Sequence, residues 1–171
     1  MTLTRTRLNL SLFLIRLGCA AFLAVWASLK FLRPEWMGNV FRGTYKMTWL
    51  KKDVGLNIMG MEFGFLDIAY AVGALQMLIA FLFLIGLWRT LSYGLVTLIH
   101  ATGVIGSLLS GGLVFKGGLI KAISTGTFAI GYINFPANLL WTSVATLTAL
   151  VGLFLMRHHD GWTIDGWRKR R

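Results

Sequence analysis

The chain has 171 residues, of which 56% are hydrophobic and 13% are charged, and its mean hydropathy is +0.69. Soluble domains average about 25% charged residues, so this composition excludes an ordinary water-soluble core and predicts a membrane protein. The net charge of +11 does not indicate nucleic-acid binding, because the cations lie at the ends of apolar runs and in the C-terminal "RKRR", residues 168–171. Anionic lipid headgroups are the expected partners of this basic tail.

Four runs are apolar and long enough to cross a bilayer, since about 20 apolar residues span its hydrocarbon core. They cover residues 8–31, 64–87, 91–114 and 137–156. Backbone polar groups in lipid must bond within their own segment, which predicts helices. The sequence therefore predicts an all-α integral membrane four-helix bundle. It forms a single transmembrane domain, residues 1–171, with both termini on the same side.

The connections between these runs differ in length and polarity. A short "WRT" stretch, residues 88–90, predicts a tight hairpin and makes the second and third helices antiparallel neighbours. The first connection, residues 32–63, is long and charged. The third, residues 115–136, is semi-polar and rich in glycine, and Lys116 and Lys121 interrupt its first half. We expect it to lie on the membrane surface or to dip into the bundle, rather than to span.

The orientation of the bundle follows weakly from charge. Each side of the membrane would carry eight Lys and Arg residues, so the positive-inside comparison is tied. The short N-terminal arm and the tight hairpin carry only positive charge. We therefore expect cytoplasmic termini in a bacterial inner membrane.

The ionisable or amide side chains singled out within the apolar runs are Arg16, Asp67, Gln76 and His100, and Asp67 lies near the membrane edge. At about 1.5 Å per residue, Arg16, Gln76 and His100 fall at a similar depth on three different helices. Polar groups at membrane depth usually face the bundle interior or a partner group, so these residues are the candidate ligand-binding cluster. Two alternatives remain open. Arg16 can extend toward the headgroups, and His100 can serve as a hydrogen bond between helices.

A second polar group is expected at the opposite membrane edge. Lys30 lies fourteen residues after Arg16, nearly four helical turns, so both lie on one face. Because the first two helices run antiparallel, Lys30 reaches the edge where Glu62 and Asp67 lie. The sequence predicts a structural ion pair between Lys30 and one of these two carboxylates.

The C-terminal stretch "RHHDGWTID", residues 157–165, contains two adjacent histidines and two aspartates. Adjacent histidines on a helix project about 100° apart, which is a poor arrangement for chelating one metal. We interpret the stretch as a solvated helix end and predict no metal site. Cys19 is the single cysteine, and we interpret it as a small residue in a helix. No catalytic residue can be assigned.

The first run resembles the opening of DoxX-type membrane proteins. In "IRLGCAAFLAVWASLKF", residues 15–31, an arginine is followed by a glycine, an aromatic-rich middle and a lysine near the helix end. Arg16, Gly18 and Lys30 occupy those places. The resemblance implies a four-helix membrane bundle.

A second stretch, "GALQMLIAFLFLIGLWRTLSYGL", residues 73–95, also resembles that family, with Gln76 where a glutamate is common. The two stretches contain 40 of the 171 residues, and the resemblance as a whole extends over about half of the chain. Some DoxX-like proteins are membrane subunits of a thiosulfate:quinone oxidoreductase. The resemblance thus implies a subunit of a quinone-linked redox complex, with quinone as a cofactor that Arg16, Gln76 and His100 would bind.

An alternative function is open from the same residues. The chain would be a non-catalytic accessory or scaffold subunit of a larger respiratory or photosynthetic membrane complex, with other membrane subunits or a second copy as partners. The absence of recognisable catalytic motifs and the aromatic content favour this alternative. A small transporter is a third interpretation, which would require oligomerisation to enclose a pathway.

Overall fold

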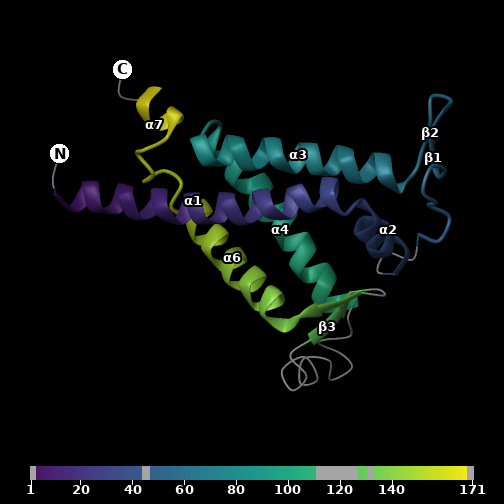
Figure 1. The fold of residues 1–171 in the computed structure, drawn as a ribbon. Helices are drawn as coiled ribbons and strands as arrows, with labels where there is room; N and C mark the ends of the chain where they lie inside the picture. Colours follow the sequence, from purple (N-terminus) through teal and green to yellow (C-terminus); the bar gives the residue numbers. More distant parts are fainter. Residues whose placement is uncertain (1–2, 44–46, 111–126, 131–132, 169–171) are drawn as a thin grey trace.

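The computed structural model describes residues 3–43, 47–110, 127–130 and 133–168, and they are mostly helical. In this part of the chain, four long helices lie at the places where apolar runs predict them (Figure 1). These are α1 (Leu3–Leu32), α3 (Phe65–Ile85), α4 (Arg89–Ser110) and α6 (Ala137–Leu155). The prediction of a mainly helical protein is therefore confirmed, while two short β-hairpins were not predicted.

The first connection is more structured than the sequence indicates. It contains a short helix, α2 (Pro34–Gly43), and an antiparallel hairpin of β1 (Leu56–Ile58) and β2 (Met61–Phe63). The two turn residues, Met59 and Gly60, both have positive φ angles, of 54° and 84°. Such angles at both central positions match the right-handed twist of the flanking strands.

A second hairpin belongs to the third connection. Strands β3 (Thr127–Ile130) and β4 (Ile133–Pro136) pair antiparallel, and α6 follows directly. Lys116 and Lys121 lie outside the described residues, so the predicted course of the first half of this connection is not tested.

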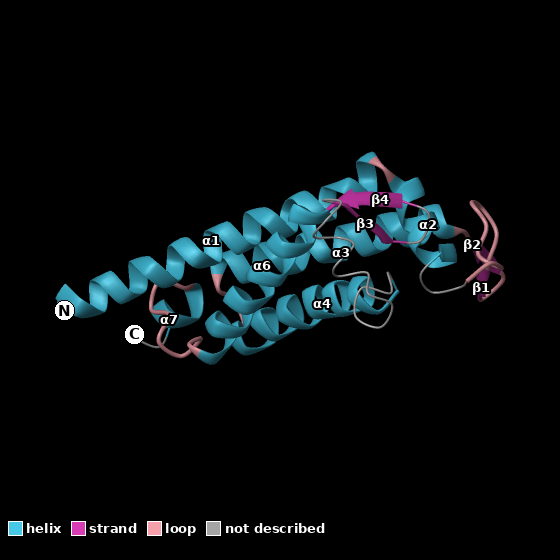
Figure 2. Ribbon diagram, turned by 90° about the horizontal axis from the view of Figure 1, so that it is seen from below, coloured by secondary structure: helices cyan, strands magenta, loops and turns pink. Residues whose placement is uncertain are grey.

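The long helices pack in two closely contacting pairs, α1 with α3 and α4 with α6. Figure 1 shows α1 and α3 side by side and the other pair diverging from them, whereas in the view of Figure 2 the long helices run in a similar direction. Gly73 lets α1 and α3 approach closely, because a Cβ there would lie 2.9 Å from the Phe31 ring. All four helices contribute to the apolar core: Leu12, Cys19, Ala20, Ile79, Phe83, Tyr93, Val96, Leu150 and Leu153.

Two of the described helices are long and apolar enough to cross a membrane, Thr4–Leu32 and Phe65–Ile85, and Trp141–Leu155 is a shorter apolar helix. Large apolar side chains are exposed on all four long helices, among them Val25, Leu98 and Leu155. Water-soluble monomers rarely expose contiguous apolar surface on this scale.

The turn between α3 and α4 is tight, as predicted, and it organises one end of the molecule. Gly86 ends α3 in the left-handed conformation, with φ of 66°, and α4 begins three residues later at Arg89. The chain after α6 returns to this end and forms α7 (Ile164–Arg168). In Figure 1, α7 lies at the same end of the helices as the start of α1.

Candidate functional site

A buried ion pair joins the first helix to the C-terminal segment. Arg16 is 1% exposed and Asp160 is 0% exposed, and Arg16 Nη1 donates to Asp160 Oδ2. Tyr93 on α4 completes the group: its hydroxyl donates to the same carboxylate oxygen over 2.6 Å and accepts from Arg16 Nη1 over 3.0 Å. These side chains thus connect α1, α4 and the segment after α6.

The α1 face that carries Arg16 also contacts the backbone of this segment. Arg16 Nη2 donates to the carbonyl oxygen of Trp162 over 2.6 Å, and Asn9 Oδ1 accepts the backbone N–H of Gly161 over 2.9 Å. Asn9 and Arg16 are seven residues apart, two helical turns, and therefore lie on one face. Both are fully buried polar side chains, which is costly unless they are bonded.

Arg89, the first residue of α4, holds the same segment from the other side. Its Nη1 donates to the carbonyl oxygens of Arg157 and Asp160, at 2.9 and 2.7 Å. Its backbone N–H donates to Asp165 Oδ2 over 2.8 Å. A carboxylate near the start of a helix is favourable, because the first turn has unpaired N–H groups and a partial positive charge.

Thr163 fits against the turn between α3 and α4. Its hydroxyl donates to the Asp160 carbonyl and accepts the Gly166 N–H, at 3.2 and 2.9 Å. A Cβ on Gly86 would overlap the Thr163 side chain, so this close approach requires glycine. We call residues 157–168 the C-terminal latch, since they close one end of the helices through these contacts.

Three buried atoms of the cluster have no hydrogen-bond partner within the described part of the chain. They are Asn9 Nδ2, Arg16 Nε and Asp160 Oδ1. An unpaired buried polar group costs about 1–3 kcal/mol, and in native proteins such groups usually bind ordered water. The cluster therefore has donors and an acceptor available for small polar molecules.

The structure separates the contacts of the predicted ligand-binding residues. Arg16 bonds within the cluster above, whereas His100 Nε2 lies 2.9 Å from the Ser143 carbonyl oxygen and its ring meets Phe22 edge-to-face. Gln76 is half-buried on α3. No hydrogen bond joins Arg16, Gln76 and His100 to one another in the described structure. Their role in binding a ligand stays a prediction.

The predicted ion pair of Lys30 is wrong. Lys30 Nζ donates to the Trp26 carbonyl one turn earlier in α1, over 3.1 Å. Asp67 instead accepts the Gly64 N–H over 3.0 Å, since a carboxylate in the first turn of α3 satisfies the N–H groups there. Glu62 is exposed on β2, and among the described residues no ion pair joins it to Lys30.

The interpretation of residues 157–165 as a solvated helix end is also wrong. Asp160 and Thr163 are buried, and they make the contacts that dock the latch. A signal was present in the sequence: a buried Arg16 requires an anion, and both termini were expected on one side. Residues 157–165 were therefore already placed at the membrane edge nearer to Arg16.

These observations define a class of protein: mostly helical, with two helices long and apolar enough to cross a membrane, and with a buried ion pair between α1 and the latch. In the described ranges, no group of three His, Cys, Asp or Glu side chains could hold a metal ion. No family model, curated protein or solved structure matches the chain. The DoxX-like resemblance stays a prediction.

Proposed function

We propose that the chain is a multi-pass integral membrane protein in which α1, α3, α4 and α6 all span the bilayer. At about 1.5 Å per residue, the 22 residues of α4 and the 19 residues of α6 extend about 33 and 28 Å. The hydrocarbon core is about 30 Å thick. Leu91, Leu98 and Val151 on these helices are exposed and would face lipid.

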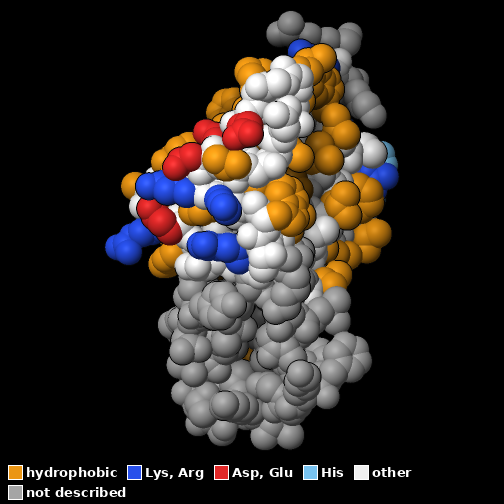
Figure 3. All heavy atoms as spheres, turned by 90° about the vertical axis from the view of Figure 1, so that its right-hand side faces the viewer, with side chains coloured by type: hydrophobic (Ala, Val, Ile, Leu, Met, Phe, Trp, Pro, Cys, Tyr) orange, Lys and Arg blue, Asp and Glu red, His pale blue; other side chains and the backbone are white. Residues whose placement is uncertain are grey.

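The charged residues of the first connection support this placement. Lys51, Lys52 and Asp53 are exposed beyond the ends of the helices. Figure 3 views this end and shows basic and acidic side chains gathered on one part of the face, with hydrophobic side chains beside them. Such a division suits the boundary between headgroups and lipid tails. The C-terminal latch would lie at the opposite boundary, on the cytoplasmic side of a bacterial inner membrane.

Within the membrane, the chain acts as a non-catalytic subunit that organises a larger complex. The observation that carries this proposal is the use of its buried polar groups. Arg16, Tyr93 and Asp160 bond to one another, and Arg89 bonds to the latch backbone. These groups serve the internal structure, while apolar side chains of all four long helices are exposed to lipid or to another membrane protein.

Extraction and purification test this proposal. The chain should stay in the membrane fraction after alkaline carbonate washing, and gentle-detergent purification should retain a companion subunit. If that companion carries haem, flavin or pigment, its absorbance spectrum identifies the type of complex. Its activity should survive His100→Phe. Release of the chain by carbonate would contradict the membrane location, and purification without a companion would contradict the scaffold role.

One observation favours a second candidate, the DoxX-like quinone-linked subunit. A carbonyl oxygen only accepts hydrogen bonds, so His100 Nε2 must donate to Ser143. In the neutral ring, Nδ1 is then an acceptor, which suits a quinol hydroxyl group. The Phe22 ring lies 5.6 Å from the His100 ring, and the Trp26 ring lies 6.2 Å from that of Phe22. These aromatic side chains would provide apolar surface for a quinol ring.

The same variant distinguishes the two candidates. For such a site, His100→Phe should weaken binding of a ubiquinol analogue about tenfold or more, because the Nδ1 acceptor of the quinol hydroxyl is lost. Thr102→Val is the matched control, since Thr102 is an exposed residue of the same helix whose hydroxyl donates to the Ile99 carbonyl. Unchanged binding in His100→Phe would refute the quinone site and leave the scaffold role.

A further inference from the structure

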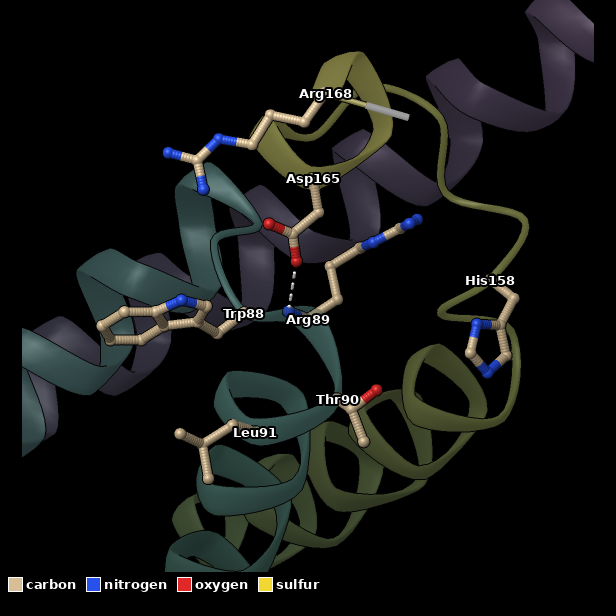
Figure 4. Close-up of a pocket in the computed structure, with 7 residues that line it drawn as sticks. All are labelled: Trp88, Arg89, Thr90, Leu91, His158, Asp165 and Arg168. Atoms are coloured by element: carbon tan, nitrogen blue, oxygen red, sulfur yellow. Dashed lines mark hydrogen bonds between the residues drawn. The ribbon is translucent and has the colours of Figure 1, made fainter. Parts of the chain in front are cut away.

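A cavity of about 630 Å³ lies where the turn between α3 and α4 meets the latch. Figure 4 shows that its wall comes from the start of α4 on one side and from the latch with α7 on the other. The lining residues are Trp88, Arg89, Thr90, Leu91, His158, Asp165 and Arg168. Its lining includes none of Arg16, Tyr93 and Asp160. The contacts of Arg89 and Asp165 described above account for part of the lining, but they do not involve Trp88, Leu91 or the Arg168 side chain.

The cavity is positively charged. Arg89 and Arg168 contribute two cations, against the single carboxylate of Asp165. This carboxylate already accepts the backbone N–H of Arg89 over 2.8 Å. In the described structure no ion pair joins Asp165 to Arg168. The charge of Arg168 is therefore not neutralised by the one acid in the wall.

Arg89 is a buried donor with remaining capacity. Its side chain is 7% exposed, and Nη1 donates to two carbonyl oxygens. Among the described residues, Nη2 and Nε have no acceptor. Figure 4 shows the Arg89 guanidinium group on the His158 side of Asp165, whereas the Arg168 guanidinium group extends to the other side of that carboxylate. A guanidinium fixed in this way presents N–H groups in the fork geometry that phosphate oxygens match.

The rim of the cavity is apolar. Trp88 is 58% exposed, and Leu91, one turn along the chain, is also exposed. Tryptophan side chains concentrate at the level of the lipid headgroups, where the ring meets both tails and water. Cations beside an exposed indole and a leucine are the combination that suits a phosphate attached to an acyl chain.

We propose that this cavity binds a phosphate group, from an anionic lipid headgroup or from free phosphate, with Arg89 and Arg168 as its donors. The lipid source rests on the proposed membrane location, whereas binding of free phosphate does not. Trp88 and Leu91 contact the acyl chain when the phosphate belongs to a lipid.

The experiment uses the full chain in phosphatidylcholine vesicles that contain phosphatidylglycerol brominated in its acyl chains. Bromine quenches a nearby indole, and Trp88→Phe identifies the share of the signal that comes from Trp88. Arg168→Glu should weaken the phosphatidylglycerol-dependent quenching of Trp88 about tenfold, because one charge-assisted contact becomes repulsive. Arg5→Glu is the matched control, since Arg5 is an exposed cation at the same end.

A second arm uses inorganic phosphate and the chain in a neutral detergent, with Trp88 fluorescence as the readout. A response to phosphatidylglycerol alone assigns the site to a lipid, and a response to inorganic phosphate alone assigns it to the free ion. Equal quenching in Arg168→Glu and Arg5→Glu, or no response in either arm, would overturn the proposal. If the chain resists carbonate washing but shows no Trp88 response in either arm, the phosphate site is refuted and the proposed membrane location still stands.

Discussion

At the scale of single residues, the most informative contact is the buried pair of Arg16 and Asp160. Burying two charges is costly, and their attraction offsets this only when further hydrogen bonds satisfy both groups. Tyr93 and the Trp162 carbonyl supply some of these bonds, while Arg16 Nε and Asp160 Oδ1 have no partner among the described residues. The ion pair therefore mainly fixes the position of the C-terminal latch, because the latch can dock here only if Asp160 reaches Arg16.

The pair should behave as a coupled unit when it is mutated. Arg16→Met leaves a buried carboxylate and Asp160→Asn leaves a buried guanidinium, so each alone should lower the free energy of unfolding by about 3–5 kcal/mol. The double variant should cost clearly less than the sum. Reversible unfolding in mixed micelles measures all three values. Asp53→Asn, an exposed carboxylate, is the control. Additive losses would show that the two charges do not interact.

The sequence indicated one half of this site. Arg16 stands out as an ionisable residue in an apolar run, and the requirement for a polar partner follows directly. The identity of the partner does not follow, because Asp160 lies 144 residues away and its stretch is polar enough to look solvated. The role of Tyr93 could not be predicted either, since tyrosines are common in apolar helices. Contacts that depend on how a loop returns to a helix end are not encoded in local spacing.

At the scale of elements, the turn from α3 to α4 and the latch form one unit. Gly86 ends α3, its carbonyl oxygen accepts the Asp165 N–H over 3.4 Å, and Thr163 packs where a Cβ would otherwise be. The apolar run predicts α3, and the short "WRT" stretch predicts the turn. The docking of the latch onto that turn depends on side-chain shape, which periodicity does not contain.

Two glycines with positive φ allow this unit to be tested. Gly60→Ala places a Cβ in open space, so it should cost only the backbone strain of about 1 kcal/mol. Gly86→Ala has the same backbone strain and also displaces Thr163, so the total should reach about 2–4 kcal/mol. Unfolding in mixed micelles gives both values, and limited proteolysis reports release of residues 157–168. Equal losses in the two variants would show that the latch does not pack against Gly86.

At the scale of the whole molecule, the sequence predicts the four long helices and their order, because each depends on the length of an apolar run. Their contacts were harder to predict. The expected meeting of Arg16, Gln76 and His100 relied on depth alone, and depth does not fix the direction in which a side chain points. The β1–β2 hairpin was missed because its strands have three residues each, too few for a period to show.

The proposed topology places the β1–β2 hairpin and the latch on opposite sides of the membrane. Cys19→Ala removes the single native thiol, so engineered cysteines report position alone. Met59→Cys, at a residue 96% exposed on the hairpin, should react with a membrane-impermeant maleimide in intact spheroplasts. Trp167→Cys, on the exposed side of α7, should react only after lysis. The reverse pattern would contradict cytoplasmic termini, and labelling of both in intact spheroplasts would contradict opposite sides.

A third cysteine decides whether α4 spans the membrane. Leu98 is exposed and lies near the middle of α4, nine residues after Arg89. If α4 crosses the bilayer, this position lies about 14 Å along the helix from Arg89, within the hydrocarbon core. A thiol there meets no water and stays protonated, so Leu98→Cys should resist the impermeant maleimide before and after lysis and should react once the protein is denatured. Rapid labelling after lysis, at a rate close to that of Trp167→Cys, would place α4 in water and contradict the proposal that all four long helices span the bilayer.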